Sequence, residues 1–251
     1  KGMINMEFGL VKKINEQYNE VGPVNICIVG DSVSHGCFGG IEPHYDRDAV
    51  YHERLRRMMF EAYPNSMVNV INTAVGGSCA SLALEHFDRD VKIHNPDLVI
   101  VCFGLNDVGE PFEKSMTWLS GIFDKCRENG FDCIFMTPNM LNTYVDEADT
   151  PTQYIGYASV TAKWQTEGRM DTYIEKAKNL CAEKGITVCD CYAEWKKMYE
   201  AGEDTTKLLA NRINHPLRRM HKLFADKLYE TIFGGLALSE KEKAGDGMIK
   251  R

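Results

Sequence analysis

The chain of 251 residues lacks several features that would assign it to a class at once. No apolar stretch approaches the roughly 20 residues that a membrane-spanning helix requires. No basic cluster stands out, and 36 Asp and Glu outnumber 29 Lys and Arg, which gives a formal charge of −7. Because nucleic-acid binding needs a concentrated basic face, we expect no nucleic-acid partner. Internal repeats and low-complexity tracts are also lacking.

Metal and disulfide patterns are missing too. The nine cysteines are an odd number and lack the paired CxxC spacing of a zinc site. Several lie in apolar runs typical of central strands, where a thiol acts as a small hydrophobe, so we expect reduced structural thiols and no metal. Residues 1–10 lack the apolar core of a signal peptide. This favours a cytoplasmic location, with prior removal of a leader as the alternative.

Five short apolar runs predict strands, at 24–29, 67–71, 98–103, 131–136 and 186–189. Most are continuous rather than alternating, as expected for parallel strands covered by helices on both faces. Apolar residues at helical spacing separate them, over about 51–62, 116–126, 171–184 and 217–228, and Ser115 is a candidate N-cap. This alternation predicts a single doubly wound, flavodoxin-like three-layer α/β/α domain with a five-stranded, mainly parallel sheet.

We expect this domain to occupy residues 1–238. The stretch 139–169 is polar and aromatic and is interpreted as an insertion over the site. Its Tyr144, Tyr154, Tyr157 and Trp164 could form an aromatic platform for a substrate, or could equally pack the insertion onto the domain. Residues 239–251 are predicted to be a charged C-terminal tail with few apolar anchors.

Polar residues follow the predicted strands where ligands of open α/β sheets bind, beyond the carboxyl ends. The segments are GDSVSHG at 30–36, NTAVGGS at 72–78 and GLND at 104–107, with NRINHP at 211–216 ahead of the last predicted helix. Together these four segments resemble the GDSL, or SGNH, family of esterases and lipases. That family is named for a Ser, a Gly, an Asn and a His in such blocks, in this order.

The resemblance spans about residues 24–228 and implies the SGNH hydrolase fold and a serine esterase without a cofactor. It makes Ser32 the nucleophile and His215 the general base. The oxyanion hole would comprise the backbone N–H groups of Ser32 and Gly77 and the side-chain amide of Asn106. Gly76 is an alternative to Gly77, because the two glycines are adjacent.

The residue types suit this chemistry. A serine hydroxyl is a poor nucleophile until an imidazole takes its proton. Attack on an ester then places negative charge on the carbonyl oxygen, which preorganised N–H donors stabilise. His35, three residues after Ser32, could also line the pocket.

One position departs from the family pattern. An Asp usually stands three residues before the histidine, but this chain has Arg212, which cannot accept a hydrogen bond. Three kinds of group remain open as the partner of the imidazole. One is a main-chain carbonyl, another is a carboxylate of the preceding loop, from Asp204 or Glu203, and the third is the side-chain amide oxygen of Asn211 or Asn214. We therefore predict a Ser–His dyad with a non-standard orienting group, and Asp204 is the candidate acid.

The predicted function is hydrolysis of a carboxylic ester through an acyl-enzyme. Short acyl groups, such as acetyl on a carbohydrate or a similar small ester, are favoured because no conspicuous apolar stretch could hold a fatty tail. A longer-chain lipase or thioesterase is the alternative within the family. Other hypotheses are a flavodoxin-like module binding a flavin phosphate through Ser32, Ser34 and Gly36, and a glycan-binding protein without activity, suggested by Arg212. The oligomeric state is left open.

Overall fold

A five-stranded parallel sheet forms the centre of the fold. The computed structural model describes residues 8–16, 18–39 and 44–234. Its strands are β1 (Val24–Gly30), β2 (Val68–Asn72), β3 (Leu98–Cys102), β4 (Asp132–Met136) and β5 (Thr187–Cys189). All neighbouring strands pair in parallel, in the order β2-β1-β3-β4-β5. The predicted doubly wound α/β fold is thus confirmed, and the predicted strands lie within one or two residues of the observed ones.

Strand burial follows position in the sheet. Every residue of the central strand β3 is buried, whereas β2, at the edge, is only partly buried. A strand covered on both faces has no solvent side, which explains its continuous apolar sequence.

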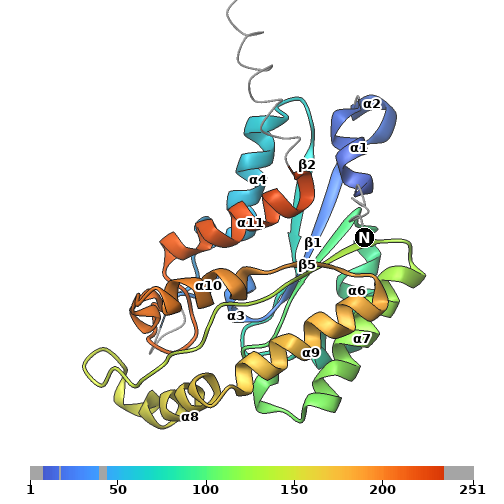
Figure 1. The fold of residues 1–251 in the computed structure, drawn as a ribbon. Coiled ribbons are helices and arrows are strands. Elements are labelled where there is room, and N and C mark those ends of the chain that lie inside the picture. The colour runs from blue at the N-terminus through green and yellow to red at the C-terminus, as the bar shows by residue number, and fades with distance from the viewer. Residues whose placement is uncertain (1–7, 17, 40–43, 235–251) are drawn as a thin grey trace, which may run out of the picture.

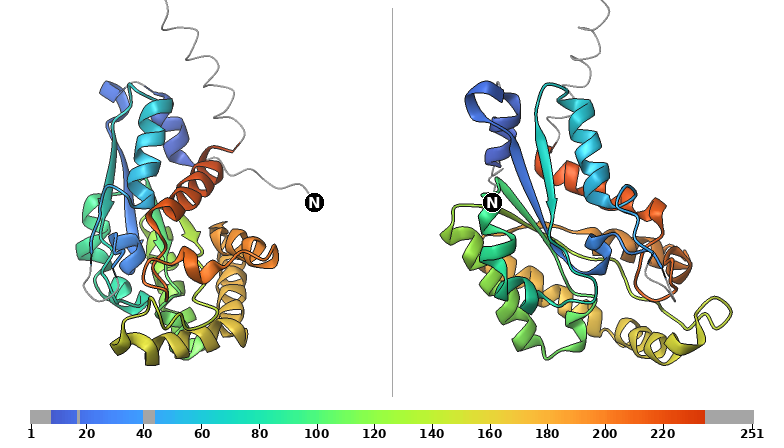
Figure 2. Two further views of the ribbon diagram at one scale, coloured as in Figure 1. Left: turned by 90° about the vertical axis from the view of Figure 1, so that its left-hand side faces the viewer. Right: turned by 180° about the vertical axis from the view of Figure 1, so that it is seen from behind.

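Helices cover both faces of the sheet (Figures 1 and 2). The α-helices are α1 (Gly9–Asn15), α2 (Tyr18–Val21), α3 (Ser32–His35), α4 (Tyr51–Ala62), α5 (Ala80–Glu85), α6 (Phe87–Asp90), α7 (Phe112–Glu128), α8 (Ile155–Thr166), α9 (Arg169–Lys184), α10 (Cys191–Glu200) and α11 (His221–Phe233). Short 3₁₀ helices are η1 (Lys92–His94), η2 (Asp107–Gly109), η3 (Thr152–Tyr154), η4 (Thr205–Leu208) and η5 (Arg218–Met220). On one face α4 packs against α11, and on the other α7 packs against α5 and α9.

Two predicted helix starts differ from the structure. Helix α7 begins at Phe112 after Pro111, so Ser115 is not its N-cap. The Ser115 hydroxyl is instead buried and donates to the Asp107 carbonyl oxygen at 3.0 Å. The last predicted helix is divided, because the 3₁₀ turn η5 precedes α11.

The insertion contributes an extended segment followed by η3 and α8. Asn139, Met140, Leu141 and Asn142 are buried, so the start of the segment packs into the domain. The predicted tail 239–251 lies outside the described residues. All nine cysteines are free thiols. Among the described residues, no cluster of His, Cys, Asp and Glu could hold a metal ion, and no helix could cross a membrane.

Candidate active site

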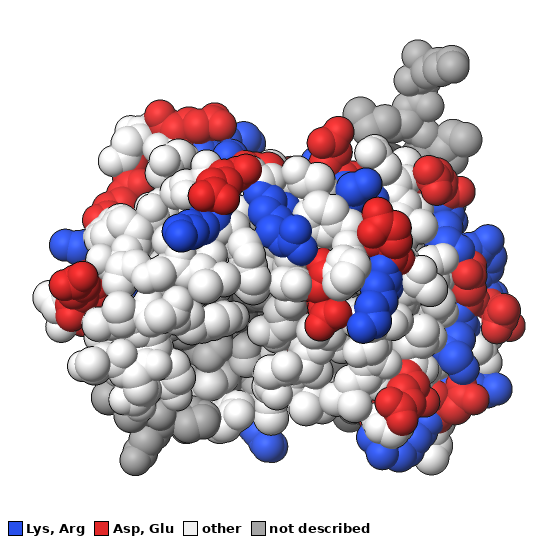
Figure 3. All heavy atoms as spheres, turned by 90° about the horizontal axis from the view of Figure 1, so that it is seen from below, with Lys and Arg blue, Asp and Glu red and all other residues white. Residues whose placement is uncertain are grey.

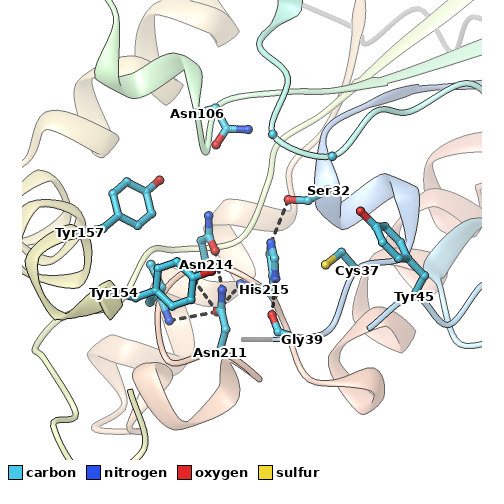
Figure 4. Close-up of a pocket in the computed structure, with 13 residues that line it drawn as sticks. Ser32, Cys37, Gly39, Tyr45, Asn106, Tyr154, Tyr157, Asn211, Asn214 and His215 are labelled. Atoms are coloured by element: carbon cyan, nitrogen blue, oxygen red, sulfur yellow. Dashed lines mark hydrogen bonds between the residues drawn. The ribbon is translucent and has the colours of Figure 1, made fainter. Parts of the chain in front are cut away.

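The nucleophile candidate lies on a tight turn after β1. A Cβ atom on Gly30 would approach the Cys102 carbonyl oxygen to 2.8 Å, so the turn requires glycine there. The Asp31 side chain accepts a hydrogen bond from the Val33 N–H at 2.9 Å and caps the short helix α3. Ser32 is therefore the first residue of this helix, and its hydroxyl faces the cavity (Figure 4).

His215 lies beside Ser32, although 183 residues separate them in sequence. Its Nε2 atom is 2.9 Å from the Ser32 Oγ atom, and its Nδ1 atom is 3.1 Å from the Gly39 carbonyl oxygen (Figure 4). A carbonyl oxygen can only accept, so this bond places the proton on Nδ1. Nε2 is then unprotonated and can accept the serine proton, which is the tautomer that a general base needs.

No side-chain carboxylate orients His215 in the described structure, contrary to the expectation for Asp204. Asp204 instead accepts a hydrogen bond from the Tyr144 hydroxyl at 2.8 Å and caps η4 through the Lys207 N–H. Of the alternatives left open by the sequence, a main-chain carbonyl is the one that contacts the ring, and it belongs to Gly39.

Arg212 points away from the histidine. Its backbone adopts a left-handed conformation, with φ of 58°, and its guanidinium pairs with Asp149 at 2.7 Å and with Asp146 at 3.2 Å. Arg212 therefore ties the histidine loop to the insertion rather than to the imidazole.

Asn211 shapes the loop that carries the histidine. Its Oδ1 atom accepts hydrogen bonds from the N–H groups of Ile213, Asn214 and His215, at 2.9–3.0 Å. Its Nδ2 atom donates to the Asn214 Oδ1 atom at 2.9 Å. The sequence pattern indicates Asn211 only as a possible partner of the imidazole and does not predict this role. The sequence feature that could have indicated this role is the tendency of an Asn side chain to hydrogen-bond the backbone groups that follow it in a turn.

Two further groups of the cavity lining can donate to an oxyanion, and one of them, the Asn106 side chain, lies above Ser32 in Figure 4. The Gly76 N–H is engaged by the His35 Nδ1 atom at 3.2 Å, whereas the Gly77 N–H has no acceptor among the described residues. This difference favours Gly77 over Gly76 as a donor. The Asn106 Nδ2 atom donates one hydrogen to the Ser78 carbonyl oxygen at 2.9 Å, which orients the amide and leaves its second hydrogen available. Both Gly77 and Asn106 line the same cavity as Ser32.

This cavity has a volume of about 340 Å³. It carries no Asp, Glu, Lys or Arg among the described lining residues, which are Ser32, Cys37, Gly39, Tyr45, Gly76, Gly77, Asn106, Tyr154, Tyr157, Asn211, Ile213, Asn214 and His215. Of the four insertion aromatics, Tyr154 and Tyr157 line it. Tyr144 bonds Asp204 and Trp164 packs on the core. His35 lies behind Gly76 rather than on the lining.

Burial sets the electrostatics of the site. It lowers the pKa of His215, an effect that the hydrogen bond to Gly39 opposes, so the imidazole is neutral at neutral pH. Burial also raises the pKa of Asp31 to about 7 and that of Asp107 to about 6. Both carboxyl groups accept backbone N–H bonds, from Val33 and Ala80 respectively, which suits a structural role in their loops.

The first loop offers little to a flavin phosphate. The Ser34 hydroxyl is fully buried and hydrogen-bonded to the Tyr51 hydroxyl at 2.9 Å, so it does not face the cavity. This contact argues against the flavodoxin-like alternative.

Solved structures share this fold at low sequence identity. The acetylxylan esterase Axe2 from Geobacillus stearothermophilus superposes with a TM-score of 0.63 and 18% identity, covering 83% of this chain and 94% of that one. The acetyl xylan esterase AlAXEase gives 0.64 and 17%, covering 83% and 100%. LAE5, an α/β hydrolase from the metagenome of Lake Arreo, Spain, gives 0.64 and 19%, covering 85% and 96%.

Sequence comparison identifies the family. No curated protein sequence matches the chain significantly. The sequence profile of the GDSL-like lipase/acylhydrolase family matches residues 28–223, which include all four segments of the site. The chain therefore belongs to the GDSL-like lipase/acylhydrolase family and is a carboxylic ester hydrolase.

Proposed function

We propose that this protein is a serine esterase that removes short acyl groups, acetyl in particular, from a carbohydrate or a similar small alcohol. The observation that carries the proposal is the 2.9 Å contact between Ser32 Oγ and His215 Nε2, at a cavity whose lining includes Gly77, the N–H of which has no acceptor among the described residues. A nucleophile, a base and an oxyanion donor then surround one position for the ester carbonyl.

The reaction proceeds in two halves. His215 Nε2 takes the proton of the Ser32 hydroxyl as Oγ attacks the ester carbonyl carbon. The N–H groups of Ser32 and Gly77 and the Asn106 amide stabilise the oxyanion. When the oxyanion collapses, the ester C–O bond breaks and the leaving alkoxide takes the proton from His215. In the second half, His215 deprotonates a water molecule, which attacks the acyl-enzyme and releases the carboxylic acid and free Ser32.

The Gly39 carbonyl supplies orientation without a full negative charge. It fixes the tautomer and ring position of His215, as the acid of a Ser-His-Asp triad does. As a neutral dipole, it stabilises the imidazolium less than a carboxylate would. We therefore propose a dyad with a base weaker than that of a full triad.

The character of the cavity supports an uncharged substrate with a small acyl group. Its lining lacks formal charges, and its volume of about 340 Å³ is at the small end for ligand pockets. The surface view shows a broad uncharged area on the side of the molecule where α8 lies (Figure 3). Two structural neighbours, AlAXEase and Axe2, are acetylxylan esterases, which gives further support. Longer acyl chains are the second candidate within the family.

A chain-length series tests the proposal. Purified protein is assayed on p-nitrophenyl acetate, butyrate and octanoate, and acetate release is measured from acetylated xylan and mannan. We expect turnover to fall with acyl length and to vanish in Ser32→Ala. Labelling of native protein, but not Ser32→Ala, by a fluorophosphonate would support Ser32 as the nucleophile. The proposal would be overturned if the native protein hydrolysed none of these esters and was not labelled by the fluorophosphonate.

A further inference from the structure

Two polar groups face the cavity without a partner among the described residues. One is the Nδ2 atom of Asn214, a residue that is only 7% exposed. The other is the hydroxyl of Tyr157, on α8. In Figure 4 both side chains flank the space to the left of Ser32, between Asn106 and His215. Neither belongs to the proposed nucleophile, base or oxyanion hole.

The orientation of the Asn214 amide is fixed by Asn211. The Oδ1 atom of Asn211 is occupied by three backbone N–H groups, so only its Nδ2 atom can bond Asn214. Asn214 must therefore present its oxygen to Asn211 and its nitrogen to the cavity, because the reverse orientation would bring two amide N–H groups together. The free donor is thus a consequence of the loop geometry. A ligand oxygen that enters the cavity would satisfy it.

The position of this donor indicates which part of an ester it meets. In the proposed reaction, His215 Nε2 gives its proton to the leaving alkoxide, so the alcohol part of the ester lies next to the imidazole. Asn214 directly precedes His215 on the same loop, and Tyr157 lies across the cavity from Ser32 in Figure 4. The amide donates, whereas the phenol can donate and accept. A hydroxyl group on the alcohol, near the ester oxygen, matches both.

We propose that Asn214 and Tyr157 form an alcohol subsite, which binds a hydroxyl neighbouring the ester and so selects esters of polyols and sugars over those of simple alcohols. This inference rests on the proposed function and specifies its substrate class. The surroundings of Tyr157 suit a neutral ligand. Lys163 is the only charged residue of α8, and the exposed neighbours Gly156 and Val160 carry no charge.

A pair of matched esters isolates the subsite. Cyclohexyl acetate and trans-1,2-cyclohexanediol monoacetate share the acyl group and the ring and differ by one hydroxyl beside the ester. The ratio of their kcat/KM values is measured for the native protein, Tyr157→Phe and Asn214→Leu. Tyr199→Phe is the control, because Tyr199 is similarly exposed, at 43% against 40%, but lies on α10 away from the cavity lining.

We expect the native protein and Tyr199→Phe to prefer the diol ester by roughly tenfold, the effect of one or two hydrogen bonds. The preference should fall several-fold in each cavity variant. Tyr157→Phe removes only the hydroxyl oxygen of an exposed side chain, so we expect this variant to keep the native structure of the site. A native ratio near one, or a ratio unchanged in both variants, would overturn the inference.

Binding to Ser32→Ala protein separates this inference from the proposed function. The affinities of the same two esters for this variant are measured by ligand-observed NMR, with and without Tyr157→Phe. We expect tighter binding of the diol ester, and loss of that difference with Tyr157→Phe. If the native protein hydrolyses no ester, the proposed function fails, and the binding comparison still decides the subsite. Equal binding of both esters would contradict it.

Discussion

The His215 imidazole is held by the main-chain carbonyl oxygen of Gly39, which lies 3.1 Å from Nδ1. Here Arg212 stands three residues before His215, and no carboxylate among the described residues contacts the ring. The neutral carbonyl sets the tautomer and leaves the imidazole without a charged partner.

Removal of Asp204 should leave catalysis nearly unchanged. Asp204 contacts Tyr144 and caps η4, and it does not touch His215. We expect kcat/KM of Asp204→Ala for p-nitrophenyl acetate to stay within about twofold of the native value, as for a surface substitution. His215→Ala, measured in parallel, should be inactive. A loss of tenfold or more in Asp204→Ala would indicate that its carboxylate reaches the imidazole.

Asn211→Ala should impair both stability and activity. The substitution removes the acceptor for three backbone N–H groups, at about 1 kcal/mol each, so the free energy of unfolding should fall by about 2–3 kcal/mol. Because these bonds fix the turn before His215, kcat should fall as well. Urea unfolding and steady-state kinetics measure the two effects.

Asn211→Asp is the matched control, since a carboxylate oxygen still accepts from the three backbone N–H groups and only the donor to Asn214 is lost. It should recover most of the lost stability. Equal destabilisation by Ala and Asp would mean that the three backbone bonds are not the source of the effect.

His35 should act on the reaction through Gly76. Its Nδ1 atom accepts the Gly76 N–H at 3.2 Å, and its ring packs on Tyr45 with centroids 4.5 Å apart. His35→Phe keeps a ring but removes the acceptor, which should displace the Gly76–Gly77 segment. We expect kcat to fall roughly 10- to 100-fold with little change in KM.

His35→Asn restores an acceptor near the Nδ1 position and should recover much of kcat. A comparable loss in both variants would point to packing against Tyr45 instead. Burial, and the charge of Arg47, lower the pKa of His35, so its acceptor is available at neutral pH.

The pH–rate profile should have its acid limb below pH 6.5. His215 must be neutral to accept the serine proton, and burial lowers its pKa below the ordinary value of 6.5. Activity should therefore persist as pH falls to 6.5 and decline only as pH drops through the lowered pKa. The measurement is kcat/KM for p-nitrophenyl acetate between pH 4 and 8.

The same pH–rate profile, measured for His35→Asn, shows which histidine is responsible for the acid limb. An unchanged midpoint attributes it to His215, because the variant has no titratable group at position 35. A native midpoint above pH 7 would require a charged partner for the imidazole and would contradict the neutral Gly39 contact.

The strands and the convergence of the motifs could be predicted because each depends on local sequence. A strand covered on both faces needs a continuous apolar run, as in β3, and parallel strands bring the segments after them to one edge. This rule places the segments with Ser32 and Asn106 at one edge, whereas the pairing of Ser32 with His215, which follows no strand, was implied by the resemblance to the GDSL family.

The group that orients His215 could not be predicted in this way. The Gly39 contact uses a carbonyl that every residue possesses, so no residue type marks it. The Asn211 network likewise depends on the path of the loop, including the left-handed backbone of Arg212. Helix α7 begins at Phe112, directly after Pro111, so Ser115 lies in its first turn, where its hydroxyl is buried against Asp107.

Arg212 has a consequence for building chimaeras of this protein. Its pairs with Asp146 and Asp149 fasten the insertion to the loop that carries the histidine. Replacing the insertion alone with that of another esterase would leave a partly buried guanidinium without its two counterions, on the loop that carries His215. A functional graft must therefore exchange Arg212 together with its two aspartates, so that the insertion and the loop that carries His215 are transferred as one unit.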